Sequence, residues 1–177
     1  HKILLEQIAR PGMMVFDIGA NIGYYALMEL GLIGPTGRML AIEPSPSNIA
    51  LLKRNLELNS EGERITVLEG AVSDKPGTAA FHLSAHSNLG TFHASGSAEK
   101  LLSGEQISVR TYTVPELAAE HGAPDLIRMD VEGHEVEVIR GMIPAIREAA
   151  MKPTIIFETH LSRYSEDHDM AGVLREL

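Results

Sequence analysis

The fold is decided by the stretch MMVFDIGANIG at residues 13–23. Met13 to Ile18 form a short apolar run broken only by Asp17, which is typical of a central parallel strand covered on both faces. Gly19 and Gly23 then allow the backbone to turn sharply and to approach a ligand closely. The helix that we expect next presents unpaired N–H groups at its N-terminus. The stretch therefore predicts a strand-to-helix junction that binds a polar ligand.

Apolar residues outside this stretch alternate between strand and helix periods, which predicts a layered α/β domain. We expect strands at residues 13–18, 38–42, 65–68, 125–131 and 154–159, and helices at residues 3–8, 21–32, 46–56, 115–121, 135–146 and 169–177. Pro144 should interrupt its helix, because proline removes a helical hydrogen bond. This order predicts one domain over residues 1–177 with a doubly wound, Rossmann-like, mostly parallel sheet. Because the chain stops where a sixth strand would follow, we expect the sheet to lack its C-terminal strands.

The pattern is looser between the third and fourth of these strands. Residues 79–83 suit a short strand, and residues 107–114 alternate in the manner of an edge strand. Residues 84–104, between them, are rich in Ser, Ala, Gly and His. We predict that this segment is mobile without substrate and folds over the site when substrate binds.

Composition and charge exclude several classes of function. The 177 residues contain no cysteine, which excludes disulfides, thiolate metal sites and a cysteine nucleophile. A formal net charge of -9 argues against nucleic acid as a partner, because Lys and Arg neutralise the phosphates in such complexes. No apolar run approaches the roughly 18 residues of a membrane span, and we see no signal peptide. We therefore expect a cytoplasmic protein without a membrane partner that acts on a small molecule, and the sequence indicates no oligomeric state.

Two acids indicate what binds beside the glycines. The G-x-G-x-x-G spacing that holds a pyrophosphate is absent, and Asp17 would repel a pyrophosphate. Asp17 suits an ammonium group instead, such as that at the methionine end of S-adenosylmethionine. Glu43 ends the second strand, where an acid can accept hydrogen bonds from both ribose hydroxyls, which predicts a nucleoside. The alternative is a tight turn without a ligand and a solvated glutamate.

A dense group of titratable residues ends the fourth strand, in the segment DVEGHE at residues 130–135. Ligands of open parallel sheets bind beyond the carboxyl ends of the strands, near the reversal of strand order, and this segment should border that crevice. We expect Asp130, Glu132 and His134 to belong to the site, whereas Glu135 suits an exposed helix start. Glu132 and His134 are both candidates for a general base, and the sequence does not choose between them.

A smaller group, Glu158 and His160, ends the fifth strand and is expected to face the same crevice. Together with Asp130 and Glu132 it offers carboxylate and imidazole ligands that divalent cations accept. No recognised ligand spacing supports such a site, so we expect no metal.

The motifs, in this order, resemble the FkbM family of methyltransferases from about Val15 to His160. The first is FDIGANIGY at residues 16–24, in which asparagine takes the place of the middle glycine common in other methyltransferases. The second is EPSP at residues 43–46. The third, RMDVEGHE at residues 128–135, resembles the family's KIDVEGxE segment, with Arg-Met in place of Lys-Ile.

The resemblance implies a class I methyltransferase fold with S-adenosylmethionine as the cofactor. The cofactor residues that it implies are Asp17, Gly19, Asn21 and Gly23 around the methionine part, Glu43 at the ribose with Pro44 beside it, Ala71 and Val72 or neighbouring Ser73 at the adenine, and Asp130 near the transferred methyl group. The implied reaction is O-methylation of a hydroxyl on a saccharide or a secondary metabolite. Methylation of nucleobases is disfavoured, because the Asn/Asp-Pro-Pro-Tyr/Phe motif of those enzymes is absent.

Two other functions compete with this interpretation. The first is an NAD(P)-dependent oxidoreductase or a nucleotide-sugar enzyme on a related fold, although the phosphate-binding loop is missing. The second is an inert nucleoside-binding module. Its weakness is that the acids of the site are intact, at Asp17, Glu43 and Asp130.

Overall fold

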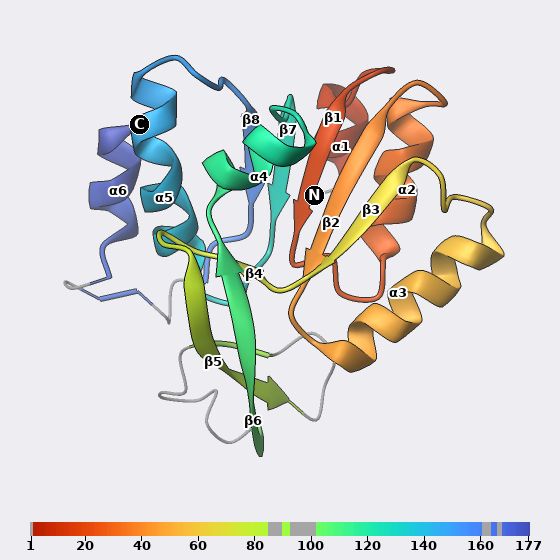
Figure 1. Ribbon diagram of the computed structural model, residues 1–177. Coiled ribbons are helices and arrows are strands. Elements are labelled where there is room, and N and C mark those ends of the chain that lie inside the picture. The colour runs from red at the N-terminus through yellow and green to blue at the C-terminus, as the bar shows by residue number, and fades with distance from the viewer. Residues whose placement is uncertain (1, 85–89, 93–101, 161–163, 166–167) are drawn as a thin grey trace.

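The computed structural model describes residues 2–84, 90–92, 102–160, 164–165 and 168–177 (Figure 1). Its centre is a five-stranded sheet of order β3-β2-β1-β7-β8, in which every neighbouring pair is parallel. The strands are β1 (Met14–Ile18), β2 (Arg38–Glu43), β3 (Ile65–Glu69), β7 (Leu126–Met129) and β8 (Thr154–Phe157). The strand order reverses between β1 and β7, so the predicted doubly wound α/β fold is confirmed.

Helices cover both faces of this sheet (Figure 1). One face carries α1 (Lys2–Ile8), α2 (Tyr24–Ile33) and α3 (Pro46–Leu58), and the other carries α4 (Val114–His121), α5 (Glu135–Arg147) and α6 (Met170–Glu176). Side chains alternate along β1, so that Phe16 and Ile18 pack beneath α5 while Val15 packs toward α2. Both faces of the strand are therefore covered, as the sequence predicted. Within the described part of the chain, the helices are too short or too polar to cross a membrane.

A second sheet lies beyond the carboxyl ends of the main strands. It contains β4 (Ala71–Val72), β5 (Gly77–Ser84) and β6 (Leu102–Tyr112) in the order β4-β6-β5. The prediction of an edge strand at residues 107–114 is wrong, because β6 starts earlier and is the central strand of this sheet. Alternation reveals that one face of a strand is buried, but it does not reveal how many neighbours the strand has.

Both ends of the segment predicted to be mobile, residues 84–104, belong to strands β5 and β6. Residues 85–89 and 93–101 lie outside the described residues, so the predicted mobility stays a prediction. Thr91 exchanges backbone hydrogen bonds of 2.9 and 3.1 Å with His82. Its hydroxyl donates to the carbonyl oxygen of Glu132 at 3.1 Å. Residues 90–92 thus connect β5 with the loop that follows β7.

The helix α5 continues through Pro144, so the predicted interruption is wrong. Proline at this position leaves the carbonyl group of Arg140 without its helical donor. Both residues are exposed, so water can satisfy that carbonyl group and the helix persists to Arg147.

Candidate active site

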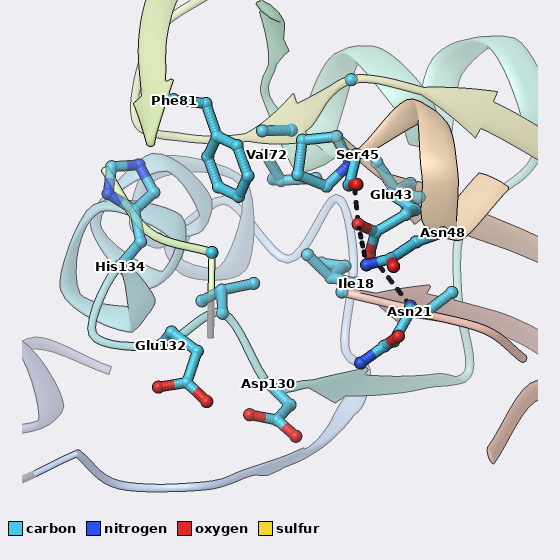
Figure 2. Close-up of a pocket in the computed structure, with 18 of the residues that line it drawn as sticks. Ile18, Asn21, Glu43, Ser45, Asn48, Val72, Phe81, Asp130, Glu132 and His134 are labelled. Atoms are coloured by element: carbon cyan, nitrogen blue, oxygen red, sulfur yellow. Dashed lines mark hydrogen bonds between the residues drawn. The ribbon is translucent and has the colours of Figure 1, made fainter. Parts of the chain in front are cut away.

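A cavity of about 630 Å³ opens at the carboxyl ends of β1, β2 and β7, where the strand order reverses (Figure 2). The second sheet and Phe92 complete its wall. The sequence-predicted residues that line this cavity are Gly19, Asn21, Glu43, Pro44, Ala71, Val72, Asp130, Glu132, His134 and Glu158. The fold thus brings most of the predicted site residues together, whereas Asp17 and Gly23 do not line the cavity.

The turn after β1 depends on backbone conformations that favour glycine. Gly19, Asn21 and Gly23 have φ angles of 81°, 52° and 89°. A Cβ atom on Gly19 would overlap the carbonyl oxygen of Asp130, and one on Gly23 would lie 2.5 Å from Leu52 Cδ1. Because residues 21–23 form this turn, α2 begins at Tyr24 and not at residue 21 as predicted. Gly19 lets the chain pass close to the loop after β7, and Gly23 lets α2 start against α3.

Glu43, the last residue of β2, organises one side of the cavity through three hydrogen bonds (Figure 2). Its Oε2 accepts from the backbone N–H of Asn21 at 3.0 Å, and its Oε1 accepts from the N–H of Ser45 and from Asn48 Nδ2, each at 3.0 Å. Burial raises the pKa of Glu43, and these hydrogen bonds oppose the rise. A carboxylate can accept about four hydrogen bonds, so Glu43 retains capacity for a ligand hydroxyl.

Asp17 is fully buried and does not reach the cavity. Its Oδ1 accepts a hydrogen bond from Arg128 Nη1 at 3.1 Å, and Arg128 Nη2 donates to Asp130 Oδ2 at 2.9 Å. Burial raises the pKa of Asp17, while the positive charge of Arg128 opposes the rise. Asp17 therefore holds Arg128 in place, which differs from the expected direct contact with a ligand ammonium group.

Arg128 is the main site residue that the sequence analysis did not assign. It lines the cavity, donates to the Gly19 carbonyl oxygen at 3.1 Å and lies 4.3 Å above the centre of the Tyr25 ring. A signal was present, because a cation within an apolar strand must be paired when that strand is buried. Its partner Asp17 lies 111 residues away in the chain, and the pairing of β1 with β7 brings the two together.

His134 lies at the opposite end of the cavity from Asn21 (Figure 2). Its side chain is buried, with Nε2 at 3.0 Å from Ser73 Oγ and Nδ1 at 3.4 Å from Glu137 Oε2. The ring packs on Phe92, with 4.5 Å between ring centres. Both ring nitrogens thus face protein groups. This arrangement indicates a packing role and disfavours His134 as a general base.

The loop after β7, the start of α5 and the segment after β8 bring four titratable residues together: Asp130, Glu132, Glu135 and His160. His160 Nε2 lies 3.5 Å from Glu132 Oε2 and 3.9 Å from Asp130 Oδ1. His160 Nδ1 lies 2.9 Å from Glu135 Oε1. The hydrogen bond with Glu135 raises the pKa of His160 although burial lowers it, and the nearby carboxylates raise it further.

Glu135 is buried rather than exposed as predicted. Burial alone would raise its pKa, but the hydrogen bonds from His160 and from the Gly133 backbone lower it below the ordinary value. Its Oε2 accepts a further hydrogen bond from the Tyr164 hydroxyl at 3.0 Å. The helix-start pattern placed Glu135 correctly in the sequence, but tertiary contacts with the end of β8 bury it.

Comparison with known proteins identifies the family. The model of the methyltransferase FkbM domain matches residues 17–177. The chain belongs to the FkbM methyltransferase family. The match includes the glycine turn, Glu43 and the loop after β7, so the FkbM motifs coincide with the walls of the cavity. Membership also disfavours the oxidoreductase alternative.

Two curated methyltransferases resemble most of the chain. The hexuronic acid methyltransferase AglP of Haloferax volcanii is 29% identical over 162 residues, which are 90% of this chain and 60% of AglP. The 31-O-demethyl-FK506 methyltransferase FkbM of Streptomyces tacrolimicus is 28% identical over 199 residues, covering 95% of this chain and 70% of that protein. The chain thus spans roughly two thirds of the length of these relatives.

Solved structures agree in fold. An FkbM methyltransferase from Methylobacillus flagellatus matches with a TM-score of 0.56 and 19% identity, covering 88% of this chain and 39% of that one. An S-adenosylmethionine-dependent methyltransferase from Aquifex aeolicus matches with a TM-score of 0.55 and 14% identity, covering 99% and 76%. At these identities the likeness establishes the class I methyltransferase architecture and nothing finer.

Proposed function

We propose that this FkbM domain is an S-adenosylmethionine-dependent methyltransferase that methylates a hydroxyl of a saccharide or a secondary metabolite. The observation that carries the proposal is the position of Glu43. Its carboxylate, with acceptor capacity to spare, lies at the end of β2 beside the turn that contains Gly19 and Asn21, and accepts the Asn21 N–H at 3.0 Å. A nucleoside with a polar tail suits this arrangement, since the ribose can bind the carboxylate while the tail binds the adjacent turn.

The residues that would hold the cofactor divide into three groups. Glu43 would accept from the ribose, with Pro44, Ala71 and Val72 forming the apolar wall for the adenine. Asn21 would bind the polar tail, because its Oδ1 is buried and has no hydrogen-bond partner among the described residues. A donor on the ligand would satisfy this oxygen, which otherwise carries a cost of about 1–3 kcal/mol. Asp17 and Gly23 would contribute from outside the cavity: Asp17 holds Arg128 in place, and Gly23 allows α2 to start where it does.

The catalytic contribution of the chain is to orient the acceptor and to remove its proton. When bound, S-adenosylmethionine supplies a methyl group whose bond to sulfur breaks as a bond to the acceptor oxygen forms, with the electron pair returning to sulfur. The hydroxyl proton goes to Glu132, which lines the cavity beside Asp130 and is partly exposed. His134 would then have a structural role, in which it holds Ser73 and Phe92 in place beside the cavity. Holding both reactants in line contributes up to about 7–11 kcal/mol to lowering the barrier.

The relatives and the charge of the chain support this acceptor class. AglP is named for a hexuronic acid and FkbM for the 31-O position of FK506, so a small oxygen-bearing molecule is the class they share. A net charge of -9 also favours a small acceptor over nucleic acid. We also propose a cytoplasmic site of action, because no apolar run in the sequence is long enough to span a membrane.

Isothermal titration calorimetry with S-adenosylhomocysteine and, separately, with NAD tests the cofactor. Binding of S-adenosylhomocysteine alone is the expected result, and binding of NAD alone would favour the oxidoreductase alternative. Methyl transfer to a panel of saccharides and polyketide alcohols, followed by S-adenosylhomocysteine release, tests the reaction. Transfer only to amines or nucleobases would reject the acceptor class, and cofactor binding without transfer to any acceptor would favour the inert module.

Variants of the two candidate bases complete the test. Glu132→Gln should lose turnover while keeping its affinity for S-adenosylhomocysteine, because the amide cannot accept the proton. His134→Ala should reduce stability more than the chemical step, since it removes a buried packing residue. Full turnover in Glu132→Gln would reject Glu132 as the base, and a selective loss of turnover in His134→Ala would assign that role to His134.

A further inference from the structure

Asp130, Glu132 and His160 form a cluster of ligand atoms at the edge of the cavity. One oxygen of each carboxylate and one imidazole nitrogen lie within 4.8 Å of one another. Asp130 and Glu132 also line the cavity, and Figure 2 shows their carboxylates on the same side of it. The two acids follow β7 and the histidine follows β8, so neighbouring parallel strands deliver all three to one edge of the sheet.

Residues outside the cluster orient its ligand atoms. Glu135 is fully buried and lies 2.9 Å from His160 Nδ1, on the far side of the ring from the cluster. In the neutral ring, a carboxylate in this position favours the imidazole proton on Nδ1, which leaves the Nε2 lone pair directed at Glu132 and Asp130. Tyr164 donates to the other oxygen of Glu135 at 3.0 Å and holds that carboxylate in place. Arg128 binds Asp130 Oδ2, so Oδ1 is the oxygen that faces the cluster.

This arrangement brings electron pairs of three groups together. When the His160 ring is neutral, the Nε2 lone pair faces a carboxylate oxygen at 3.5 Å and another at 3.9 Å, which is repulsive unless a positive charge lies between them. Metal–ligand bonds of about 2.0–2.2 Å place two ligand atoms roughly 3 to 4.4 Å apart, depending on the angle at the metal. Both observed separations lie in this range.

We propose that Asp130, Glu132 and His160 bind a divalent transition-metal cation of the Mn²⁺ type, because the two carboxylates suit Mn²⁺ and the imidazole nitrogen suits transition-metal ions more than Mg²⁺. No ligand spacing in the sequence indicates such a site, because the ligands come from two strands that are adjacent only in the fold. A cation with three protein ligands keeps coordination positions for water or for an acceptor oxygen on the cavity side. If methyl transfer is the function, as proposed above, a cation here would hold the acceptor hydroxyl and make it more acidic, and the Glu132 oxygen that is not a ligand would take the proton.

The test measures metal binding on the whole chain without cofactor or acceptor, so it is independent of the proposed reaction. Titration with MnCl₂, followed by the electron paramagnetic resonance signal of free Mn²⁺, should give one bound ion per chain. The bound ion should show coupling to a directly coordinated imidazole nitrogen in electron spin echo spectra. Asp130→Asn, Glu132→Gln and His160→Ala should each weaken binding at least tenfold, and His160→Ala should also abolish the nitrogen coupling.

Glu158→Gln is the matched control, since Glu158 lines the same cavity but its carboxylate is not part of the cluster. It should leave Mn²⁺ affinity unchanged. Circular dichroism of each variant checks folding, and Glu132→Gln keeps the test valid if His160→Ala unfolds, because glutamine has the same shape as glutamate and leaves no void. The proposal is overturned if the wild type binds no Mn²⁺ at millimolar concentration, or if Glu132→Gln and Glu158→Gln bind it equally well. In the first case a proton on His160 Nε2 supplies the positive charge.

Discussion

Replacing Arg128 with methionine should destabilise the fold, because it leaves the fully buried carboxylate of Asp17 without its cation. The side chains of the pair are 3% and 0% exposed, and Arg128 Nη1 lies 3.1 Å from Asp17 Oδ1. At that separation and an effective dielectric constant of about 20, the Coulomb energy is roughly 5 kcal/mol. Breaking a buried pair by removing one partner costs about 3–5 kcal/mol, a large share of the 5–15 kcal/mol typical of a domain.

The second substitution, Asp17→Asn, isolates the cause. The amide that it introduces carries no charge, so the double variant should be more stable than Arg128→Met alone by at least about 2 kcal/mol. Asp17→Asn alone should cost less than Arg128→Met, because Arg128 retains Asp130 as a partner. Urea unfolding followed by circular dichroism gives the free energy of unfolding of all four proteins.

The pH dependence provides an independent check. Burial already raises the pKa of Asp17, and loss of Arg128 raises it further. A group with a raised folded-state pKa stabilises the fold below its unfolded pKa and loses this contribution as pH rises through the folded pKa. The deficit of Arg128→Met should therefore shrink on acidification. Additive costs in the double variant, together with a deficit that does not change with pH, would refute the buried-pair reasoning.

Three other substitutions probe the cofactor wall and a second buried acid. Glu43→Gln should weaken S-adenosylhomocysteine binding about tenfold or more, as measured by calorimetry. The affinity of the wild type should fall as the pH drops through the raised pKa of Glu43, because the charged carboxylate is the better acceptor. Unchanged affinity would contradict the ribose assignment. Gly19→Ala should lower both the melting temperature and the cofactor affinity because its Cβ meets the Asp130 carbonyl, whereas the control Gly31→Ala, with open space on a helix, should stabilise by about 0.5–1 kcal/mol. Glu29→Gln should raise the free energy of unfolding, and the increase should grow with pH. Glu29 is fully buried, its oxygens have no hydrogen-bond partner among the described residues, and burial raises its pKa. An increase that becomes smaller as the pH rises would exclude this explanation.

The sequence by itself determined the elements whose signals are local. The apolar run before Gly19 predicts a strand covered on both faces, and Glu43 is predicted to end the next strand at the crevice. Both positions hold in the fold, because a parallel strand must present its carboxyl end at the crevice wherever the strand order reverses. The family motifs are readable for the same reason, since each lies within one short stretch.

The tertiary structure alone decided which charged groups meet. Asp17 was expected to contact a ligand, yet it pairs with Arg128, which lies on another strand. His160 reaches Glu132 and Glu135 because β7 and β8 are neighbours. Charge pairing depends on distance in space and on burial, and both are set by strand order and register. A sequence pattern records which groups are available, and only the packed sheet determines their partners.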